Sequence, residues 1–556
     1  MRLLFFYISL ILFVTSCTSN KKIKPRVRIT QEVRANLNDE IFGQFLEKPS
    51  WGGEKGPEAA LKQGTHQLQD GVFELMEDMH IPLLRFPGGT DVDFSEWTSM
   101  IDLPNRKERP LVIGNQGDTV STYFGYDEAG KLSEKLNSEF MLVINFGDGY
   151  FKKKPLKEAV MHEMGLIAYM SSNIENDLPK SLKKWPELRK KNGHELPYKI
   201  KYVQVANEPW VMDKKNISLS DTLTQETLDH YFTCLDAYVE AINTYFPELE
   251  IIIDANCLSI SPLLKERYGN RVDYVALHQY LPWGVNPFQK GDQFITRDSL
   301  TEKEVWNAWI AVPEIDEQGN SVFKDNLQVK NAYGAGYPVA MTEWNWNGWW
   351  NIKSKYEKDN TGSVVAKGFG AAGFLHAIMR DTHKIKLGIQ SLLVGNSWGI
   401  TGIRVSENEE FAPYPLPTGQ VTGLYAQHHG DRMIEVITEN IPKYQQPYKV
   451  NAIAPADSVA VLDIVSSADE KYVYVHIINR AFDDNVEITV DLSNWNLKKS
   501  TADLFSLTGN YSNSIPCDSK NNHYLCSNKQ SLKIENNELN LSLIKRSINI
   551  IKVPIN

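Results

Sequence analysis

Two glutamates stand directly after short apolar runs, in settings that suit acid–base and nucleophilic chemistry. Glu208 follows Asn207 at the end of the run 200–206, and Glu343 follows the run 337–341. Hydrolysis of an acetal needs one carboxyl group to protonate the leaving oxygen and a second carboxylate to meet the oxocarbenium-like carbon. If the fold brings these two side chains together, the pair predicts glycoside hydrolysis.

The elements that must position the two glutamates are strands that alternate with amphipathic helical stretches between about residues 40 and 400. Repeated strand–helix units predict a parallel sheet with helices outside, and eight of them favour a (β/α)8 TIM barrel over an open sheet. Active-site groups of such barrels lie at the C-terminal ends of the strands. We therefore expect Glu208, on strand four, and Glu343, on strand seven, to enter one mouth. The eight expected strands are 41–46, 82–86, 140–146, 200–206, 249–255, 272–277, 337–341 and 391–394.

After about residue 405 the pattern changes to short strand-like runs separated by Asn, Asp, Ser and Gly, which is typical of an all-β sandwich. The run 26–30, which precedes the barrel, could add a strand to that sandwich. We predict four segments: a signal peptide at 1–17, a tether and possible sandwich strand at 18–38, the catalytic barrel at 39–404, and the β-sandwich domain at 405–556.

The N-terminus resembles a bacterial lipoprotein signal. Arg2 precedes an apolar run at 3–14, which as a helix would span about 18 Å and is too short to cross a bilayer. Small residues lead into Cys17, as in a lipobox. The segment predicts an exported lipoprotein anchored through Cys17 in the outer membrane, on its periplasmic face or at the cell surface. The alternative is an ordinary secretory signal in which Cys17 has no role.

Composition narrows the class of partner. The net charge of −10 argues against a broad nucleic-acid surface, while 42% hydrophobic and 23% charged residues are ordinary for a globular protein. Aromatic residues make up 11%, which mildly favours a glycan binder. No Cys/His cluster has metal-ligand spacing, so we expect neither a metal nor a cofactor. Cys234 and Cys257 fit buried thiols, whereas Cys517 and Cys526 could close a surface disulfide.

Further motifs lie at the ends of the other expected strands. They are 42–47 (FGQFLE), 84–89 (LRFPGG), 276–280 (ALHQY), 343–345 (EWN) and 423–425 (GLY), the last followed by His429-Gly430. With them the sequence resembles clan A of the retaining glycoside hydrolases, and within that clan the α-L-arabinofuranosidases of glycoside hydrolase family fifty-one. The resemblance covers roughly residues 26 to 500.

The resemblance implies a role for each matching residue. Glu208 corresponds to the acid/base and Glu343 to the nucleophile, with Arg85 keeping Glu343 ionised and Asn207 binding the sugar 2-hydroxyl. His278 and Tyr280 would sit beside Glu343 and position it. The full set of expected substrate-binding residues is Glu47, Arg85, Asn207, His278, Tyr280, Trp344 and, after the eighth run, Asn396.

Some features depart from the family. Thr90 stands where these enzymes usually carry Cys, and the stretch 147–197 is long and rich in Lys. Two expected loops are rich in tryptophan, which would either stack on sugars in additional subsites or pack within the loops. These residues are Trp51, Trp346, Trp349 and Trp350. These departures leave open an endo-glycanase or exo-glycosidase with the same fold and mechanism that acts on galactan, xylan or a similar polymer.

Two rival classes remain. The segment 395–399 (GNSWG) matches the nucleophile elbow of serine hydrolases, but the residues after it have no helical pattern, which that elbow requires. A lipoprotein that only binds glycans would not need two glutamates at strand ends. The preferred hypothesis is a retaining enzyme that cleaves plant or algal cell-wall glycans, most simply an α-L-arabinofuranosidase, with carboxyl groups about 5–5.5 Å apart.

Overall fold

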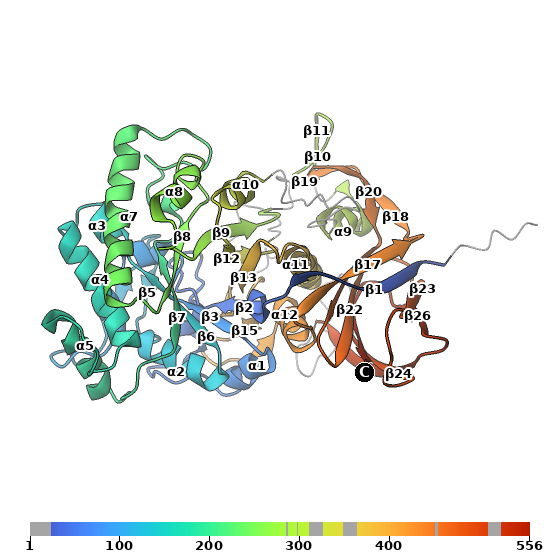
Figure 1. Ribbon diagram of the computed structural model, residues 1–556, viewed down its shortest axis with the longest axis horizontal. Coiled ribbons are helices and arrows are strands. Elements are labelled where there is room, and N and C mark those ends of the chain that lie inside the picture. Colours follow the sequence, from blue (N-terminus) through green and yellow to red (C-terminus); the bar gives the residue numbers. More distant parts are fainter. Residues whose placement is uncertain are drawn as a thin grey trace, which may run out of the picture.

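A computed structural model describes residues 24–284, 287–296, 299–310, 326–347, 364–450, 454–509 and 524–556. It consists of a closed barrel wrapped by helices and a large β-sheet beside it, which appear at the left and right of Figure 1. Cys17 and Cys517 lie outside the described residues. Among the helices that the structure describes, none is both long and apolar enough to cross a membrane.

Eight strands close the barrel in the order β12-β13-β2-β3-β6-β7-β8-β9, and all neighbouring pairs are parallel. This confirms the predicted TIM barrel. The strands are β2 (Gly43–Phe45), β3 (Leu83–Phe86), β6 (Glu139–Ile144), β7 (Ile200–Val205), β8 (Glu250–Asp254), β9 (Tyr274–Tyr280), β12 (Val339–Asn345) and β13 (Ile385–Gln390).

The eighth strand is not where the sequence analysis placed it. The apolar run 391–394 follows the strand, and β13 itself is 385–390. Ile385, Leu387 and Ile389 are fully buried, but Lys386 and Gly388 between them hide the apolar pattern. Val394–Gly395 forms β14 in a separate three-stranded sheet with β15 (Ile403–Arg404) and β16 (Tyr414–Pro415).

Helices cover the outside of the barrel, and their apolar faces share one core with the outward side chains of the strands. The α-helices are α1 (Val72–Asp78), α2 (Tyr126–Leu136), α3 (Gly147–Tyr150), α4 (Leu156–Ser171), α5 (Lys180–Lys191), α6 (Pro209–Met212), α7 (Gln225–Tyr245), α8 (Leu264–Tyr268), α9 (Glu302–Ile310), α10 (Leu327–Gly334), α11 (Val364–Arg380) and α12 (Pro417–Gln427). Short 3-10 helices are η1 (Asp39–Phe42), η2 (Gly56–Ala60), η3 (Thr90–Phe94), η4 (Trp97–Met100) and η5 (Ser261–Leu263).

The C-terminal region is rich in β-structure, as predicted, and its main sheet has nine strands. The order is β25-β24-β27-β22-β21-β17-β1-β23-β26. Strands from both ends of this order contribute to one hydrophobic cluster, so the sheet curls around its own core. The strands are β1 (Arg26–Asn36), β17 (Arg432–Glu439), β21 (Leu462–Ala468), β22 (Tyr472–Asn479), β23 (Val486–Asp491), β24 (Thr501–Thr508), β25 (Cys526–Lys533), β26 (Glu538–Leu543) and β27 (Ser547–Pro554).

Strand β1 connects the beginning of the described chain to this C-terminal sheet. It runs antiparallel to β17 and parallel to β23, and it lies between them. Smaller strands complete the structure: β4 (Val112–Ile113), β5 (Thr119–Val120), β10 (Phe288–Lys290), β11 (Gln293–Ile295), β18 (Lys443–Gln446), β19 (Lys449–Val450) and β20 (Ala456–Ala460). Cys234 and Cys257 are buried free thiols, and Cys526 is disulfide-bonded.

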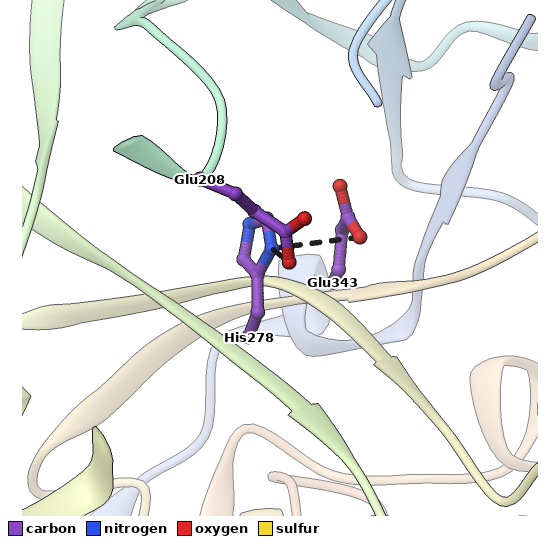
Figure 2. A group of neighbouring side chains, drawn as sticks. All are labelled: Glu208, His278 and Glu343. Atoms are coloured by element: carbon purple, nitrogen blue, oxygen red, sulfur yellow. Dashed lines mark hydrogen bonds and ion pairs between the residues drawn. The ribbon is translucent and has the colours of Figure 1, made fainter. Parts of the chain in front are cut away.

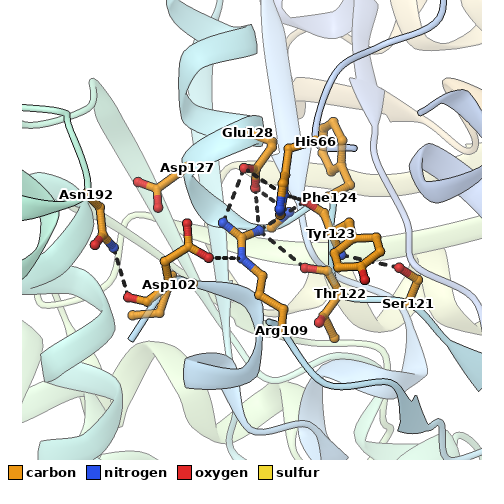
Figure 3. A network of polar contacts seen from close by, with 12 residues as sticks. His66, Asp102, Arg109, Ser121, Thr122, Tyr123, Phe124, Asp127, Glu128 and Asn192 are labelled. Atoms are coloured by element: carbon orange, nitrogen blue, oxygen red, sulfur yellow. Dashed lines mark hydrogen bonds and ion pairs between the residues drawn. The ribbon is translucent and has the colours of Figure 1, made fainter. Parts of the chain in front are cut away.

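A buried polar network fastens the long connection after β3 to helix α2 (Figure 3). Arg109 donates to Glu128 over 2.7 Å and to Asp102 over 2.9 Å, and it also donates to the backbone carbonyls of Thr122 and Tyr123. Asp127, directly before Glu128 in α2, accepts hydrogen bonds from two buried tyrosines instead. These contacts hold the loop in place and involve none of the predicted site residues.

Candidate active site

The ends of β7 and β12 bring the two predicted carboxylates together inside the mouth of the barrel (Figure 2). Glu208 lies three residues after the end of β7, as the N-cap residue of α6, and Glu343 lies within β12. One oxygen of each carboxylate and a ring nitrogen of His278 all lie within 4.8 Å of one another. The Glu343 side chain is 6% exposed and that of Glu208 is 18% exposed. The two groups therefore share a space but differ in their access to solvent.

His278, on β9, lies between the two carboxylates. Its Nδ1 is 2.9 Å from Oε1 of Glu208 and 3.5 Å from Oε2 of Glu343. Its Nε2 is 2.9 Å from the hydroxyl of Thr342, which fixes the plane of the ring. The stronger contact is thus with Glu208, whereas the sequence analysis placed His278 beside Glu343.

Arg85, at the end of β3, is fully buried and donates to three side chains. Nη1 donates to Oε1 of Glu343 over 2.9 Å, and Nη2 donates to Oδ1 of Asn207 over 2.7 Å. Nε donates to Gln204 over 2.9 Å, and the guanidinium carbon lies 4.3 Å from the centre of the Phe45 ring. A planar guanidinium with several fixed donors can orient a carboxylate and an amide at once.

Asn207 presents an amide group toward the mouth. Its Oδ1 accepts a hydrogen bond from Arg85, which leaves Nδ2 as the donor of this amide group. Nδ2 is buried and has no hydrogen-bond partner among the described residues. Since a buried polar group normally has a partner, a ligand hydroxyl is the natural acceptor here.

Tyr280 and Glu47 complete the surroundings of Glu343. The Tyr280 hydroxyl donates to Oε2 of Glu343 over 2.7 Å, so each oxygen of that carboxylate has its own donor. Glu47, just after β2, is partly exposed and packs against Gly89, where a Cβ atom would lie 2.5 Å from Oε1. Gly89 adopts φ +68°, so glycine is required there both by conformation and by space.

The surroundings of Glu343 and Glu47 shift the pKa values of these two carboxyl groups in opposite directions. Burial would raise the pKa of Glu343, but His278, Arg85 and Tyr280 outweigh it and lower that pKa below its usual range. Burial together with the charge of Glu343 raises the pKa of Glu47 well above its usual range. Burial lowers the pKa of His278, but Glu343 and Glu208 outweigh it and raise that pKa. Such separation of neighbouring titratable groups is typical of acid–base sites.

Two residues expected to bind substrate lie elsewhere. Trp344 is fully buried and stacks on Phe374 of α11 with ring centres 5.3 Å apart. Successive strand residues face opposite sides, so Trp344 points outward where Glu343 points inward. Asn396 braces a loop, since its side chain accepts from the Lys55 N–H over 2.9 Å and donates to the Gly53 carbonyl over 3.2 Å.

The loop that carries Asn396 also rules out the serine-hydrolase elbow. The N–H groups of Asn396, Ser397 and Trp398 all donate to the buried carboxylate of Glu54. The next element is the strand β15 and not a helix, so Ser397 lacks the strand-to-helix turn of a nucleophile elbow. Of the four tryptophans expected in two loops, Trp346 is buried and Trp51 packs on Trp398. Trp349 and Trp350 lie outside the described residues.

Sequence reasoning missed several residues of the site. Gln204 and Thr342 precede the conspicuous motifs and carry no signal of their own, because their contacts to Arg85 and His278 arise from strand register. Trp210 meets the His278 ring edge-on, with centres 6.0 Å apart. Its place directly after Asn-Glu-Pro was the available signal.

The same three side chains shown in Figure 2 could also hold a metal ion. Among the residues that the structure describes, Glu208, His278 and Glu343 place three ligand-type atoms close enough together to bind one ion. The chemistry of acetal cleavage uses the carboxylates directly, and no step below depends on a metal.

In sequence the chain is similar to known α-L-arabinofuranosidases. The family model described as an alpha-L-arabinofuranosidase 1 domain matches residues 75–290. An intracellular exo-alpha-L-arabinofuranosidase of Bacteroides ovatus is 23% identical over 84% of this chain and 84% of its own length. An intracellular exo-alpha-(1->5)-L-arabinofuranosidase of Acetivibrio thermocellus is 23% identical over 46% of this chain and 48% of its own length.

Solved structures share the whole architecture. The alpha-L-arabinofuranosidase of Thermotoga maritima, crystallised as an arabinose complex, superposes with a TM-score of 0.69 and 17% identity over 96% of this chain and 100% of its own. At that identity the likeness establishes the fold. Together, the barrel and the paired carboxylates at its mouth define a glycoside hydrolase. In sequence and fold the chain is similar, more particularly, to the α-L-arabinofuranosidases of family 51.

The comparisons correct the predicted location. An exported lipoprotein of the outer membrane was expected, but the relatives from Bacteroides ovatus and Acetivibrio thermocellus are named as intracellular enzymes. That prediction is therefore wrong. It depended on one short apolar run and one Cys, a pattern with little information, and Cys17 lies outside the described residues.

Proposed function

We propose that the protein is an exo-acting, retaining α-L-arabinofuranosidase that removes terminal arabinofuranosyl units from plant or algal cell-wall oligosaccharides. The observation that carries this is the spacing of Glu208 and Glu343, since one oxygen of each carboxylate lies within 4.8 Å of the other. Retaining enzymes hold their carboxyl groups about 5–5.5 Å apart, whereas inverting enzymes need about 6.5–9.5 Å to admit a water molecule. The names of the matched relatives support the sugar and the exo mode.

In the first step Glu343 attacks the anomeric carbon while Glu208 protonates the departing oxygen. A nucleophile must be ionised, and the ion pair with Arg85 and the lowered pKa of Glu343 favour that state. The bond from the anomeric carbon to the leaving oxygen breaks as the bond to Oε of Glu343 forms. The greater exposure of Glu208 suits a group that must meet both a leaving alcohol and an incoming water.

In the second step Glu208, now a carboxylate, removes a proton from water. The water attacks the anomeric carbon and releases Glu343, so the sugar leaves with the configuration it had in the substrate. Two inversions at one carbon give retention.

Other groups of the site bind the sugar in this proposal. The unoccupied Nδ2 of Asn207 donates to the 2-hydroxyl, a contact that strengthens in the transition state. Glu47, whose raised pKa favours its protonated form, is a hydrogen-bond donor to a further hydroxyl. The partly buried rings of Trp210 and Trp283 lie near His278 and Tyr280 and offer flat faces for sugar C–H groups.

The test is the hydrolysis of 4-nitrophenyl α-L-arabinofuranoside by the wild-type protein and by Glu343→Gln, with proton NMR of the first sugar released. We expect activity in the wild type, loss in the variant, and initial release of the α anomer. Parallel assays on 4-nitrophenyl β-D-xyloside and β-D-galactoside distinguish the sugar. Activity only on one of these would retain the mechanism and reject arabinose, and initial release of the β anomer would reject retention.

A further inference from the structure

The backbone around the acid/base residue adopts an unfavourable conformation. Ala206 has φ +69° and Glu208 has φ +47°, both in the left-handed region that residues with a Cβ atom rarely occupy. Between them Asn207 carries the amide that meets Arg85. A turn with two such residues would relax toward ordinary angles unless the surrounding structure held it.

The group that holds this turn is Asp93. It lies in η3, on the connection that follows β3, and it is fully buried. Its Oδ2 accepts the backbone N–H of Asn207 over 2.9 Å, and its Oδ1 accepts the N–H of Phe146 over 2.8 Å. Phe146 follows β6, the barrel neighbour of β7. One carboxylate therefore links three consecutive strand ends of the barrel.

The chemistry of the side chain suits this task. Both oxygens of a carboxylate accept hydrogen bonds, so Asp93 can satisfy N–H groups on two sides, whereas an asparagine would turn its own NH₂ toward one of them. Burial raises the pKa of the Asp93 carboxyl to about 7. The N–H groups of Phe146, Asn207 and Gly147 favour the ionised form and offset part of that rise. The backbone of η3 also packs closely on this region, since a Cβ on Gly147 would lie 2.1 Å from the Asp93 carbonyl oxygen.

We propose that Asp93 is a positioning residue for acid catalysis: by holding the Asn207 amide it keeps the turn 206–208 in the conformation that aims Glu208 at the leaving oxygen. This inference rests on the proposed function. Asp93 contacts backbone groups and neither catalytic carboxylate. Its loss should therefore weaken protonation of the leaving group more than attack by Glu343, which Arg85 and Tyr280 hold separately.

The test compares two substrates with different needs for an acid. α-1,5-Arabinobiose has a poor alkoxide leaving group and depends on protonation, whereas 4-nitrophenyl α-L-arabinofuranoside depends on it much less. We expect Asp93→Asn to lower kcat/KM on the disaccharide about 100-fold and on the nitrophenyl substrate less than about 10-fold, within the range that general acid catalysis contributes. The quantity kcat/KM is used because it reports the first step alone.

The matched control is Asp127→Asn, in which another buried carboxylate is changed in the same way; it accepts hydrogen bonds from the hydroxyls of Tyr169 on α4 and of Tyr198 just before β7. The control should lose thermal stability but keep the wild-type ratio of the two kcat/KM values. Equal loss on both substrates in Asp93→Asn would overturn the proposal, because a merely structural role lowers both together.

Asp93→Glu is the second variant if Asp93→Asn does not fold. It retains the charge, moves the oxygens by one methylene, and should change the substrate ratio in the same direction. If neither variant folds while Asp127→Asn does, Asp93 is a folding residue and the proposal is overturned. A wild-type protein that cleaves neither substrate would instead reject the proposed function.

Discussion

Arg85 and Glu343 form an ion pair inside the barrel, with Nη1 of the arginine 2.9 Å from Oε1 of the glutamate. Both side chains are shielded from solvent, so water screens the pair only weakly. Arg85 is itself held by Asn207 and Gln204, so its charge stays in place whether or not a ligand is bound. The pair therefore gives Glu343 the protonation state that a nucleophile needs before substrate arrives.

Replacing Arg85 should change the pH dependence of activity. At present His278, Arg85 and Tyr280 outweigh burial and lower the pKa of Glu343. In Arg85→Gln that pKa rises, so Glu343 takes up a proton at higher pH and the acidic limb of the kcat/KM profile moves to higher pH. We also expect kcat/KM at its optimum to fall about 10²–10³-fold, as when a preorganised donor is removed from an active site.

Arg109→Gln is the matched control, because Arg109 is likewise buried and paired with carboxylates but lies in the network of Figure 3. It should lower the melting temperature and leave the acidic limb where it is. An acidic limb that is the same in Arg85→Gln and the wild type would show that Arg85 does not govern the ionisation of Glu343.

Glu208→Ala should give an enzyme that external azide rescues. Without the acid, kcat/KM on α-1,5-arabinobiose should fall about 10²–10⁴-fold. On the nitrophenyl substrate the glycosyl–enzyme still forms, and azide attacks it without needing a base, so the product is the α-arabinofuranosyl azide. In Glu343→Ala azide replaces the nucleophile directly and the β product is expected. NMR of the two products distinguishes the roles, and exchanged configurations would reverse the assignment.

Asn207→Ala should affect substrates according to their 2-hydroxyl. If Nδ2 donates to that group, the variant should lose about 100-fold in kcat/KM on 4-nitrophenyl α-L-arabinofuranoside, equivalent to about 3 kcal/mol of transition-state binding. On the 2-deoxy analogue the loss should be much smaller, because the contact to the 2-hydroxyl is already absent and only the hydrogen bond from Arg85 to Asn207 is removed. Kinetics of both proteins on both substrates provide the check. A similar loss on the two substrates would place the amide elsewhere.

The barrel and the curled sheet are joined by a buried charge cluster whose loss should destabilise the fold. Asp463 on β21 pairs with Arg480 over 2.8 Å, with His376 over 3.1 Å and with Arg380. Removal of one partner from a buried ion pair costs about 3–5 kcal/mol. We expect Asp463→Asn to lower the free energy of unfolding by that amount at pH 7, as measured by denaturant titration. Asp483→Asn, in an exposed pair with Lys303, should change it little.

The same cluster predicts acid sensitivity. Burial would raise the pKa of Asp463, but Arg380, His376 and Arg480 outweigh it and hold that pKa well below its usual value. A lowered carboxyl pKa contributes stability above the unfolded-state value of about 3.9 that is lost as pH falls further. The free energy of unfolding of the wild type should therefore fall as the pH drops below about 4. In Asp463→Asn that free energy should depend less on pH in the same range. An unchanged dependence would contradict this assignment.

Local pattern was informative wherever a strand carried an uninterrupted apolar run. The barrel class, the ends of β7 and β12, and the pairing of Glu208 with Glu343 all followed from such runs. The eighth strand was misplaced because Lys386 and Gly388 break the pattern of β13. Because the eighth strand was misplaced, Asn396 was expected at the end of a barrel strand, whereas it lies in a loop held by Glu54.

The sequence by itself determined which residues have the chemistry for acetal hydrolysis and that a barrel would bring them to one mouth. Side-chain alternation, hydrophobic periodicity and motif spacing are local properties, so they can be recognised in the amino-acid sequence alone. Tertiary structure alone decided that His278 pairs with Glu208, that Trp344 turns outward, and that Asp93 reaches the Asn207 amide from 114 positions away. These contacts depend on strand register and on which loops meet above the barrel, and no spacing along the chain encodes them.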